Sequence, residues 1–298
     1  MTESRAATLT RDADHWIGRF VAMASPCEVL IERAPASLAQ QILDVVSAEA
    51  WRIEGKFSRY RTDSAIHRIN ELAGSETVVD DECSNLLDFA ATLTSLSEGA
   101  FDITSGVLRK VWTFDGSDRV PDQAQIDALL DRVGWYRIEW RRPVLKLQPG
   151  MQIDLGGIGK EYAVDSAAEL AQKTAPELSC LINFGGDVVV RNARQDAQPW
   201  RVGIESSSHA GAAERIVQLS RGALATSGDS RRFVQRDGHR YSHILDARTG
   251  WPVRDAPHSI TVAADTCTQA GTLTTLAMLK GANAEELLKA SGVQYWLQ

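Results

Sequence analysis

Residues 153–163 read Ile153-Asp154-Leu155-Gly156-Gly157-Ile158-Gly159-Lys160-Glu161-Tyr162-Ala163. The three glycines come just before a helical pattern, which predicts a helix from about Lys160 to Gln172. Free backbone N–H groups at a helix start, together with a lysine, form an anion site. A helix start disfavours a cation, so Lys160 suggests an anion nearby. The spacing matches neither the P-loop nor the G-x-G-x-x-G dinucleotide motif, and a plain tight turn explains the glycines equally well.

Outward from this loop, helical patterns gather in the first half of the chain and strand patterns in the second. Helices are predicted at 37–54, 86–99, 122–133, 160–172, 268–280 and 284–290. Strands are predicted at 29–31, 136–140, 144–147, 180–184, 200–205, 215–219, 223–226, 231–236, 240–245, 259–264 and 293–297. Gly55 is a predicted helix stop, and the 136–140 and 144–147 runs read as a hairpin. Because strict β–α alternation is lacking, we expect an α+β fold with mixed or antiparallel sheets and packed helices.

The amino-terminal residues give a weaker pattern. The strand at 29–31 is expected to follow an irregular start. We therefore expect an extension over residues 1–22 and a single domain over residues 23–298. No Pro-, Gly- or Ser-rich linker divides the chain further.

Composition excludes several classes of protein. The 298 residues carry a net charge of −7, which argues against a broad nucleic-acid-binding surface. No apolar run is long enough for a spanning helix, so an integral membrane protein is not expected. Residues 1–20 lack the apolar stretch of a secretory signal, which predicts a cytoplasmic protein. The four cysteines form no C-x-x-C pair and are read as buried thiols in a reducing compartment.

Four further segments combine glycine with polar residues. Gly99–Gly106 carries Asp102 and Thr104, either of which would serve as a plain helix cap. Asn183–Asp187 reads as a hairpin turn when taken alone. The remaining two are Ala225-Thr226-Ser227-Gly228-Asp229, followed by Arg231 and Arg232, and Tyr241-Ser242-His243-Ile244-Leu245-Asp246-Ala247-Arg248-Thr249-Gly250. In the first of these, hydroxyls beside arginines suit a phosphate, although a solvated loop is an equally good explanation. In the second, His243 can act as a base near neutral pH, and a histidine buried in the core is the alternative.

Taken in order, these segments resemble those of the FAD:protein FMN transferases, the ApbE family. The resemblance runs from about Met23 to Gly281. The matching pieces are Met23, Phe57-Ser58-Arg59-Tyr60, Asp63-Ser64, Asn70, Gly99–Thr104, Asp154–Lys160, Asn183–Asp187, Ala225–Gly228, Ser242–Asp246 and Thr249-Gly250. Their combined order is specific, although each piece alone is not.

The resemblance implies a fold, a reaction and a set of site residues. It implies two interleaved subdomains enclosing a flavin cleft, and transfer of FMN from FAD to a threonine or serine hydroxyl of an acceptor flavoprotein, with Mg²⁺ and release of AMP. His243 would be the catalytic base. The FAD site would be lined by Met23, Tyr60, Ala100, Phe101, Asp102, Asp154 and Lys160. The metal would be bound by a backbone carbonyl near Gly157, by Thr275 and by an aspartate.

The chain departs from the family pattern at that aspartate, where it has Gly271. Glycine supplies no carboxylate for Mg²⁺. After the lysine, the chain has Glu161 where the family usually has glycine, and this carboxylate would re-form the metal site. Alternatively, Glu161 is only a favourable acidic residue in the first turn of the helix. Asp187 and Asp265 are further candidates. The alternatives to transfer are hydrolysis of FAD to FMN and AMP, and flavin binding without catalysis.

Overall fold

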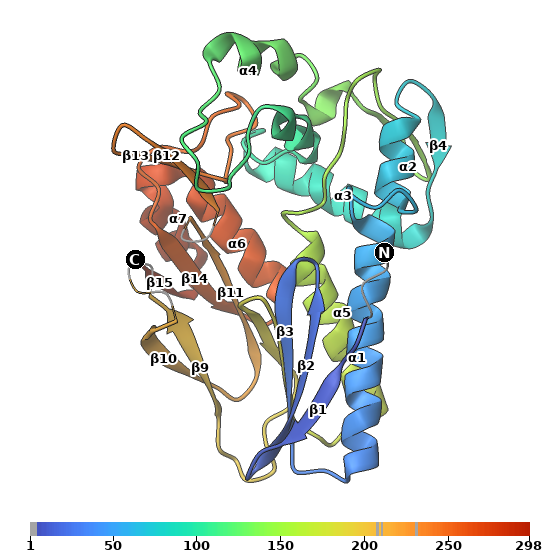
Figure 1. The fold of residues 1–298 in the computed structure, drawn as a ribbon, viewed down its shortest axis with the longest axis vertical. Helices are drawn as coiled ribbons and strands as arrows, with labels where there is room; N and C mark the ends of the chain where they lie inside the picture. Colours follow the sequence, from blue (N-terminus) through green and yellow to red (C-terminus); the bar gives the residue numbers. More distant parts are fainter. Residues whose placement is uncertain (1–4, 207–208, 210, 230–231) are drawn as a thin grey trace.

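An antiparallel sheet forms the centre of this computed structural model, which describes residues 5–206, 209, 211–229 and 232–298. Every neighbouring pair of its strands is antiparallel. Within the described residues, its strands follow the order β1 (Thr8–Arg11), β2 (His15–Ala22), β3 (Ser25–Glu32), β7 (Cys180–Phe184), β8 (Asp187–Val190), β11 (Gly222–Gly228), β14 (Ser259–Ala264) and β15 (Gln294–Leu297). The predicted α+β class with antiparallel sheets is confirmed (Figure 1).

Side-chain alternation along the strands separates two cores. On β7, Ile182 and Phe184 belong to the large core on the helical side. Leu181, which points to the other face, packs in a second cluster with Trp200 and Leu219. Those two residues come from the small sheet of β9 (Trp200–Glu205) and β10 (Ala213–Leu219), which covers that face. Strand β8 is covered on both faces, so all four of its residues are buried.

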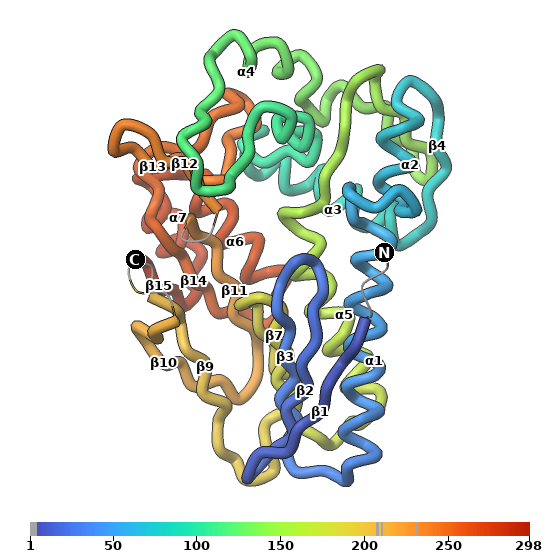
Figure 2. The backbone as a smooth tube through the Cα atoms, in the orientation of Figure 1, coloured from blue at the N-terminus to red at the C-terminus, as the bar shows by residue number. Residues whose placement is uncertain are grey.

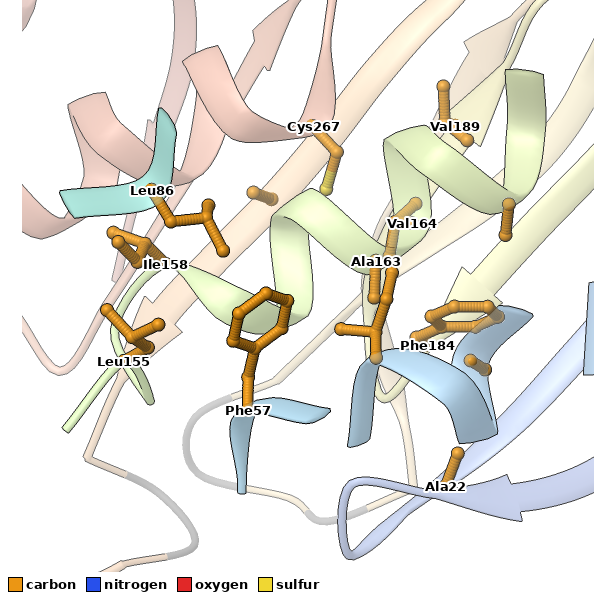
Figure 3. Close-up of a cluster of buried hydrophobic side chains, with 14 of the residues drawn as sticks. Ala22, Phe57, Leu86, Leu155, Ile158, Ala163, Val164, Phe184, Val189 and Cys267 are labelled. Carbon is orange, nitrogen blue, oxygen red and sulfur yellow. The ribbon is translucent and has the colours of Figure 1, made fainter. Parts of the chain in front are cut away.

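Three helices pack in a row against the helical side of the sheet. They are α1 (Ala36–Phe57), α5 (Gly159–Thr174) and α6 (Cys267–Leu279), with α5 in the middle. Leu155, Ile158 and Phe57 lie where α5 begins, in the same cluster as Leu86 and Cys267 (Figure 3). This anchoring fixes the loop that precedes α5.

The remaining elements form a layer beyond one end of the sheet (Figure 2). They include α2 (Ala65–Glu71), α3 (Asp81–Leu96), α4 (Gln123–Leu130), the 3₁₀ helices Ile103–Lys110 and Trp135–Arg137, and a sheet of β4 (Glu76–Val78), β6 (Val144–Lys146) and β5 (Glu139–Arg141). The hairpin of β12 (Phe233–Arg236) and β13 (His239–Ser242) lies beside this layer, whereas the 3₁₀ helix Gly281–Asn283 and α7 (Ala284–Ser291) follow α6. A separate apolar cluster, which includes Trp112, Ile126 and Ala247, packs the first 3₁₀ helix and α4 against the segment after β13, whereas α2 and α3 pack in the large core.

Several local predictions are wrong. Residues 8–22 are not irregular: they form β1 and β2, in which Gly18, Phe20 and Ala22 are buried on one face and Arg19 and Val21 are exposed on the other. The division of the chain at residue 22 stays a prediction as a domain boundary.

Two further elements differ from the pattern. Helix α1 continues through Gly55, because Phe57 is buried and Lys56 forms ion pairs with Asp80 and Glu82. The strand predicted from Tyr136 begins as a 3₁₀ turn, and its pairing with β6 starts at Glu139. The predicted strand at 231–236 is found over Phe233–Arg236; Arg231 lies outside the described residues.

Across the part of the chain that the structure describes, no helix is long and apolar enough to cross a membrane.

Candidate active site

The glycine-rich loop before α5 is held by hydrogen bonds from both sides. The N–H of Asp154 donates to the carbonyl of Ile103 at 2.8 Å. The Asp154 carboxylate accepts from the N–H of Gly156 at 2.9 Å and from Nη1 of Arg59 at 3.3 Å. The loop is therefore a built turn, with Gly156 and Gly157 exposed at its tip.

Lys160 faces a carboxylate of the protein itself. Its Nζ lies 2.6 Å from Oδ2 of Asp187, whose other oxygen accepts the N–H of Thr226 at 3.2 Å. Burial lowers the pKa of Lys160, but attraction from Asp187 and Glu161 outweighs that effect, so its pKa lies above the ordinary value. The anion expected near this lysine is Asp187 in the structure.

Asp187 is placed by the turn that the sequence predicted. Gly185 and Gly186 join β7 to β8 with φ values of +63° and +105°, a conformation that favours glycine. The hairpin interpretation of Asn183–Asp187 is confirmed, and the hairpin also delivers a buried carboxylate to Lys160. Asp265, the other candidate acid, is exposed.

Glu161 occupies the space beside Gly271. A Cβ added at Gly271 would lie 2.5 Å from Cγ of Glu161 and 2.9 Å from its Oε1. The carboxyl group is buried, and its Oε2 has no hydrogen-bond partner within the described residues. Burial, followed by repulsion from Asp187, raises the pKa of Glu161 to about 8. Glu161 on α5 and Gly271 on α6, the two residues that depart from the family pattern, are therefore in direct contact.

The predicted metal-binding residues differ in surroundings. Gly157 lies at the exposed loop tip, where a Cβ would be 3.0 Å from the ring of Phe101. Thr275 stands one turn after Gly271 on α6, half-buried. The described residues contain no group of three or more His, Cys, Asp or Glu side chains arranged to hold a metal. A site here would depend on one carboxylate plus carbonyl and hydroxyl oxygens.

Segment Gly99–Thr104 connects the loop to the histidine segment. Asp102 caps the 3₁₀ helix that follows, accepting from the N–H and hydroxyl of Thr104 at 2.8 and 2.7 Å, and its other oxygen accepts the N–H of Trp135 at 2.6 Å. The cap interpretation of Asp102 is confirmed. The carbonyl of Ala100 accepts the N–H of Ala247 at 3.0 Å.

Met23 and Tyr60 lie at the edge of this arrangement. Met23 has a positive φ of 52° in the β2–β3 turn, and its N–H donates to Glu54 at 2.8 Å. The ring of Tyr60 is 80% exposed and lies under the guanidinium of Arg59, which pairs with Asp154. Tyr60 is therefore next to the loop, whereas the hydrogen bond of Met23 leads to α1.

His243 follows β13 directly. Its N–H donates to the carbonyl of Arg232 at 3.3 Å, and its buried Nδ1 has no partner among the described residues. Burial, followed by repulsion from Arg109 and Arg232, lowers the pKa of His243 to about 4. The imidazole is therefore neutral at pH 7 and can accept a proton.

Sequence reasoning missed two arginines that shape the site. Arg59 stood inside a matching motif, so its contact with Asp154 could have been suspected. Arg109 follows a buried run and carries no local signal, because the charged groups that act on it are far away in the sequence.

The chain is similar to one protein family over almost its whole length. Residues 23–297 match the model of the ApbE family. The FAD:protein FMN transferase of Vibrio cholerae is 32% identical over 235 residues, which cover 77% of this chain and 70% of that protein. The Salmonella typhimurium protein of the same name is 30% identical over 274 residues, covering 88% and 77%.

Two solved structures share the whole fold. The ApbE protein of Thermotoga maritima has a TM-score of 0.84 and 29% identity, covering 95% of this chain and 94% of that one. The apo flavinyl transferase ApbE of Pseudomonas stutzeri has a TM-score of 0.81 and 28% identity, covering 96% and 92%. The family match and the likeness of both sequence and fold lead to one conclusion: the chain belongs to the ApbE family.

Proposed function

We propose that this chain transfers FMN from FAD to a threonine or serine hydroxyl of an acceptor protein, releasing AMP. The observation that carries the proposal is the pair of backbone hydrogen bonds to Gly99–Thr104, from Asp154 and from Ala247. Through them, the loop before Lys160 and the segment containing His243 adjoin one stretch of backbone. The names of the relatives, FAD:protein FMN transferases, support the same reaction.

FAD is proposed to lie along this stretch. The ring of Tyr60 is exposed apart from the Arg59 guanidinium over it, and the half-buried ring of Phe101 lies against Gly157. Both rings are proposed to contact aromatic parts of FAD. The residues proposed to line the FAD site are Met23, Tyr60, Ala100, Phe101, Asp102, Asp154 and Lys160. Asp102 acts there by fixing the backbone, because both its oxygens already accept protein hydrogen bonds. That two subdomains enclose a flavin cleft also stays a prediction.

His243 is proposed as the base. The acceptor oxygen bonds to the phosphorus of the FMN half while its proton passes to the imidazole. The bond from that phosphorus to the bridging oxygen breaks, and AMP leaves with the electron pair. A low pKa keeps His243 unprotonated before the reaction.

Magnesium fits the residues present, because the buried Oε2 of Glu161 lacks a partner among the described residues. Glu161, the carbonyl of Gly157 and the hydroxyl of Thr275 are proposed to hold the ion. When bound, Mg²⁺ would neutralise charge on the phosphate oxygens. Glu161 would thereby replace the carboxylate that Gly271 lacks.

The acceptor is proposed to be a flavoprotein with a modifiable threonine or serine, in the cytoplasm. All four cysteines are free thiols, which fits a reducing compartment.

The test of function measures two products from FAD: AMP, and flavin covalently attached to an acceptor domain. Purified chain is incubated with Mg²⁺ or EDTA, and with the acceptor or a variant whose threonine is alanine. We expect both products only with Mg²⁺ and the intact acceptor. AMP without need of an acceptor would establish hydrolysis instead, and flavin binding without AMP in any mixture would establish a binding protein.

Two variants sharpen this test. His243→Gln should abolish transfer and leave FAD affinity within about threefold, because base catalysis is lost but the pocket is kept. His239→Gln, an exposed position in the same hairpin, is the matched control. If His243→Gln lost transfer activity and FAD affinity to the same extent, His243 would be a residue that binds FAD rather than the base.

Metal binding is tested without activity. Mg²⁺ should raise the melting temperature of the native chain and not that of Glu161→Gln, because binding to the folded state stabilises it. The exposed Glu177→Gln is the control. An equal rise in Glu161→Gln would remove Glu161 from the metal site.

A further inference from the structure

Arg109 and His243 meet at one aromatic ring. The guanidinium of Arg109 lies 5.1 Å from the ring centre of Phe114. The imidazole of His243 meets the same ring edge-on, with centres 6.3 Å apart. Phe114 is held from behind by Trp112, stacked at 5.4 Å, in the apolar cluster beside the site. A rigid aromatic wall thus fixes a cation and the proposed base close to each other.

Arg232 adds a second cation. Its carbonyl accepts the N–H of His243, which ties the residue before β12 to the residue after β13. Among the described residues, neither the Arg109 nor the Arg232 guanidinium forms an ion pair, and the Arg109 guanidinium, which lies over Phe114, donates no hydrogen bond. The charges of Arg109 and of the exposed Arg232 both act on the imidazole of His243, whose Nδ1 is unpartnered among the described residues. These three residues make up a polar cluster with positive charge and no acid among them.

The acids near this cluster are already engaged. Asp154 attracts Arg109, but its oxygens accept from Arg59 and from the N–H of Gly156. Asp187 is paired with Lys160, the third cation that acts on His243. Burial, the largest effect, lowers the pKa of Arg109 more than the attraction of Asp154 raises it, so the cost of burying its charge is only partly offset in the free protein. An anionic ligand would relieve that cost.

We propose that Arg109 and Arg232 bind a phosphate group beside His243, as a subsite for one phosphate of the dinucleotide substrate. This inference rests on the proposed function, since it takes FAD as the ligand. A guanidinium suits phosphate because its planar donors can reach two oxygens at once. None of these three residues is among those proposed to hold the metal.

A bound phosphate would also change the base. In the free protein, cations on three segments repel a proton from His243: Arg109, Arg232 and Lys160. A phosphate between the arginines and the imidazole offsets this repulsion, so the His243 pKa rises toward its ordinary value when FAD binds. The histidine becomes a stronger base only in the complex that needs it.

The experiment compares ligands with and without phosphate. Dissociation constants for FAD and riboflavin are measured in the native chain, Arg109→Met and Arg232→Met. Methionine keeps an apolar stem against Phe114 and removes the charge. Arg11→Met is the control, since Arg11 also stacks on an aromatic ring, Trp16, at 5.6 Å but lies on β1.

We expect FAD to bind roughly 10- to 100-fold more weakly to both site variants, as expected for lost charge-assisted hydrogen bonds, and riboflavin affinity to change less than twofold. Arg109→Lys should recover part of the loss. Equal weakening of both ligands would mean a structural role for the arginines and overturn the proposal, as would unchanged FAD affinity.

Histidine NMR gives a second readout. At an FAD concentration that saturates the native chain but not Arg109→Met, FAD should raise the His243 pKa in the native chain and change it much less in the variant. A fall in the native chain would overturn the proposal. The proposed function fails separately. If the native chain binds FAD through the arginines but transfers no FMN, the subsite stands without the transferase. If it transfers FMN while both variants bind FAD normally, only the subsite is refuted.

Discussion

Replacing Gly271 by alanine should destabilise the protein, although the same change in a helix interior normally stabilises it. Gly271 lies inside α6, where alanine is favoured over glycine by about 1 kcal/mol. Here the new Cβ would lie 2.5 Å from Cγ of Glu161. That atom sits in the middle of a buried side chain, so it cannot move aside freely. Overpacking of this kind costs about 1–3 kcal/mol.

The sign should reverse once Glu161 is shortened. In a Glu161→Ala background the clashing atoms are gone, so Gly271→Ala should gain about 1 kcal/mol from helix propensity alone. The two substitutions should therefore couple by about 1–3 kcal/mol, in the range seen for residues in contact. This coupling energy measures the clash between the Glu161 side chain and a Cβ at position 271.

The assay is a double-mutant cycle of unfolding free energies from urea denaturation at pH 7 without metal. Gly55→Ala serves as the control: Gly55 lies in α1 with nothing within 4 Å of an added Cβ, so it should stabilise both backgrounds equally. If Gly271→Ala changed stability by the same amount in both backgrounds, within about 0.5 kcal/mol, the contact with Glu161 would be refuted.

Two more predictions concern groups with unusual surroundings. The pKa of His243 is about 4 in the folded chain and about 6.5 in the unfolded chain, so the unfolded chain binds the proton first as pH falls. Protonation of this residue should therefore lower the free energy of unfolding by about 3 kcal/mol between pH 6.5 and 4. In His243→Phe the total fall over this range, measured by urea denaturation at each pH, should be smaller by that amount. The Asp165 carboxylate accepts the N–H groups of Cys267 and Thr268 at the start of α6 and pairs with Arg191. Asp165→Asn should therefore lower the free energy of unfolding, measured by urea denaturation, by about 1–2 kcal/mol. A change below about 0.5 kcal/mol would show that α6 does not need this carboxylate.

Local signals carried much of the fold. The helices α5, α6 and α7 lie within two residues of their predicted bounds. In α5 and α7 the apolar residues recur at helical spacing, whereas α6 is apolar around most of its surface. The strands β7, β9 and β14 match their predicted residues. The pattern failed over residues 8–22, where a glycine and a small residue occupy buried positions and weaken the apolar alternation, and at Gly55, where a buried Phe57 extends the helix.

By itself, the sequence determined the α+β class, the order of motifs that marks the ApbE family, and the two departures from its pattern, Glu161 and Gly271. Only the tertiary structure decided that Asp187 is the partner of Lys160, that Glu161 touches Gly271, and that Arg109 shares a ring with His243. The physical reason is range. Helix periodicity, caps and turns depend on residues a few positions apart, whereas burial and charge interactions depend on distances between segments that only the packed sheet and helices bring together.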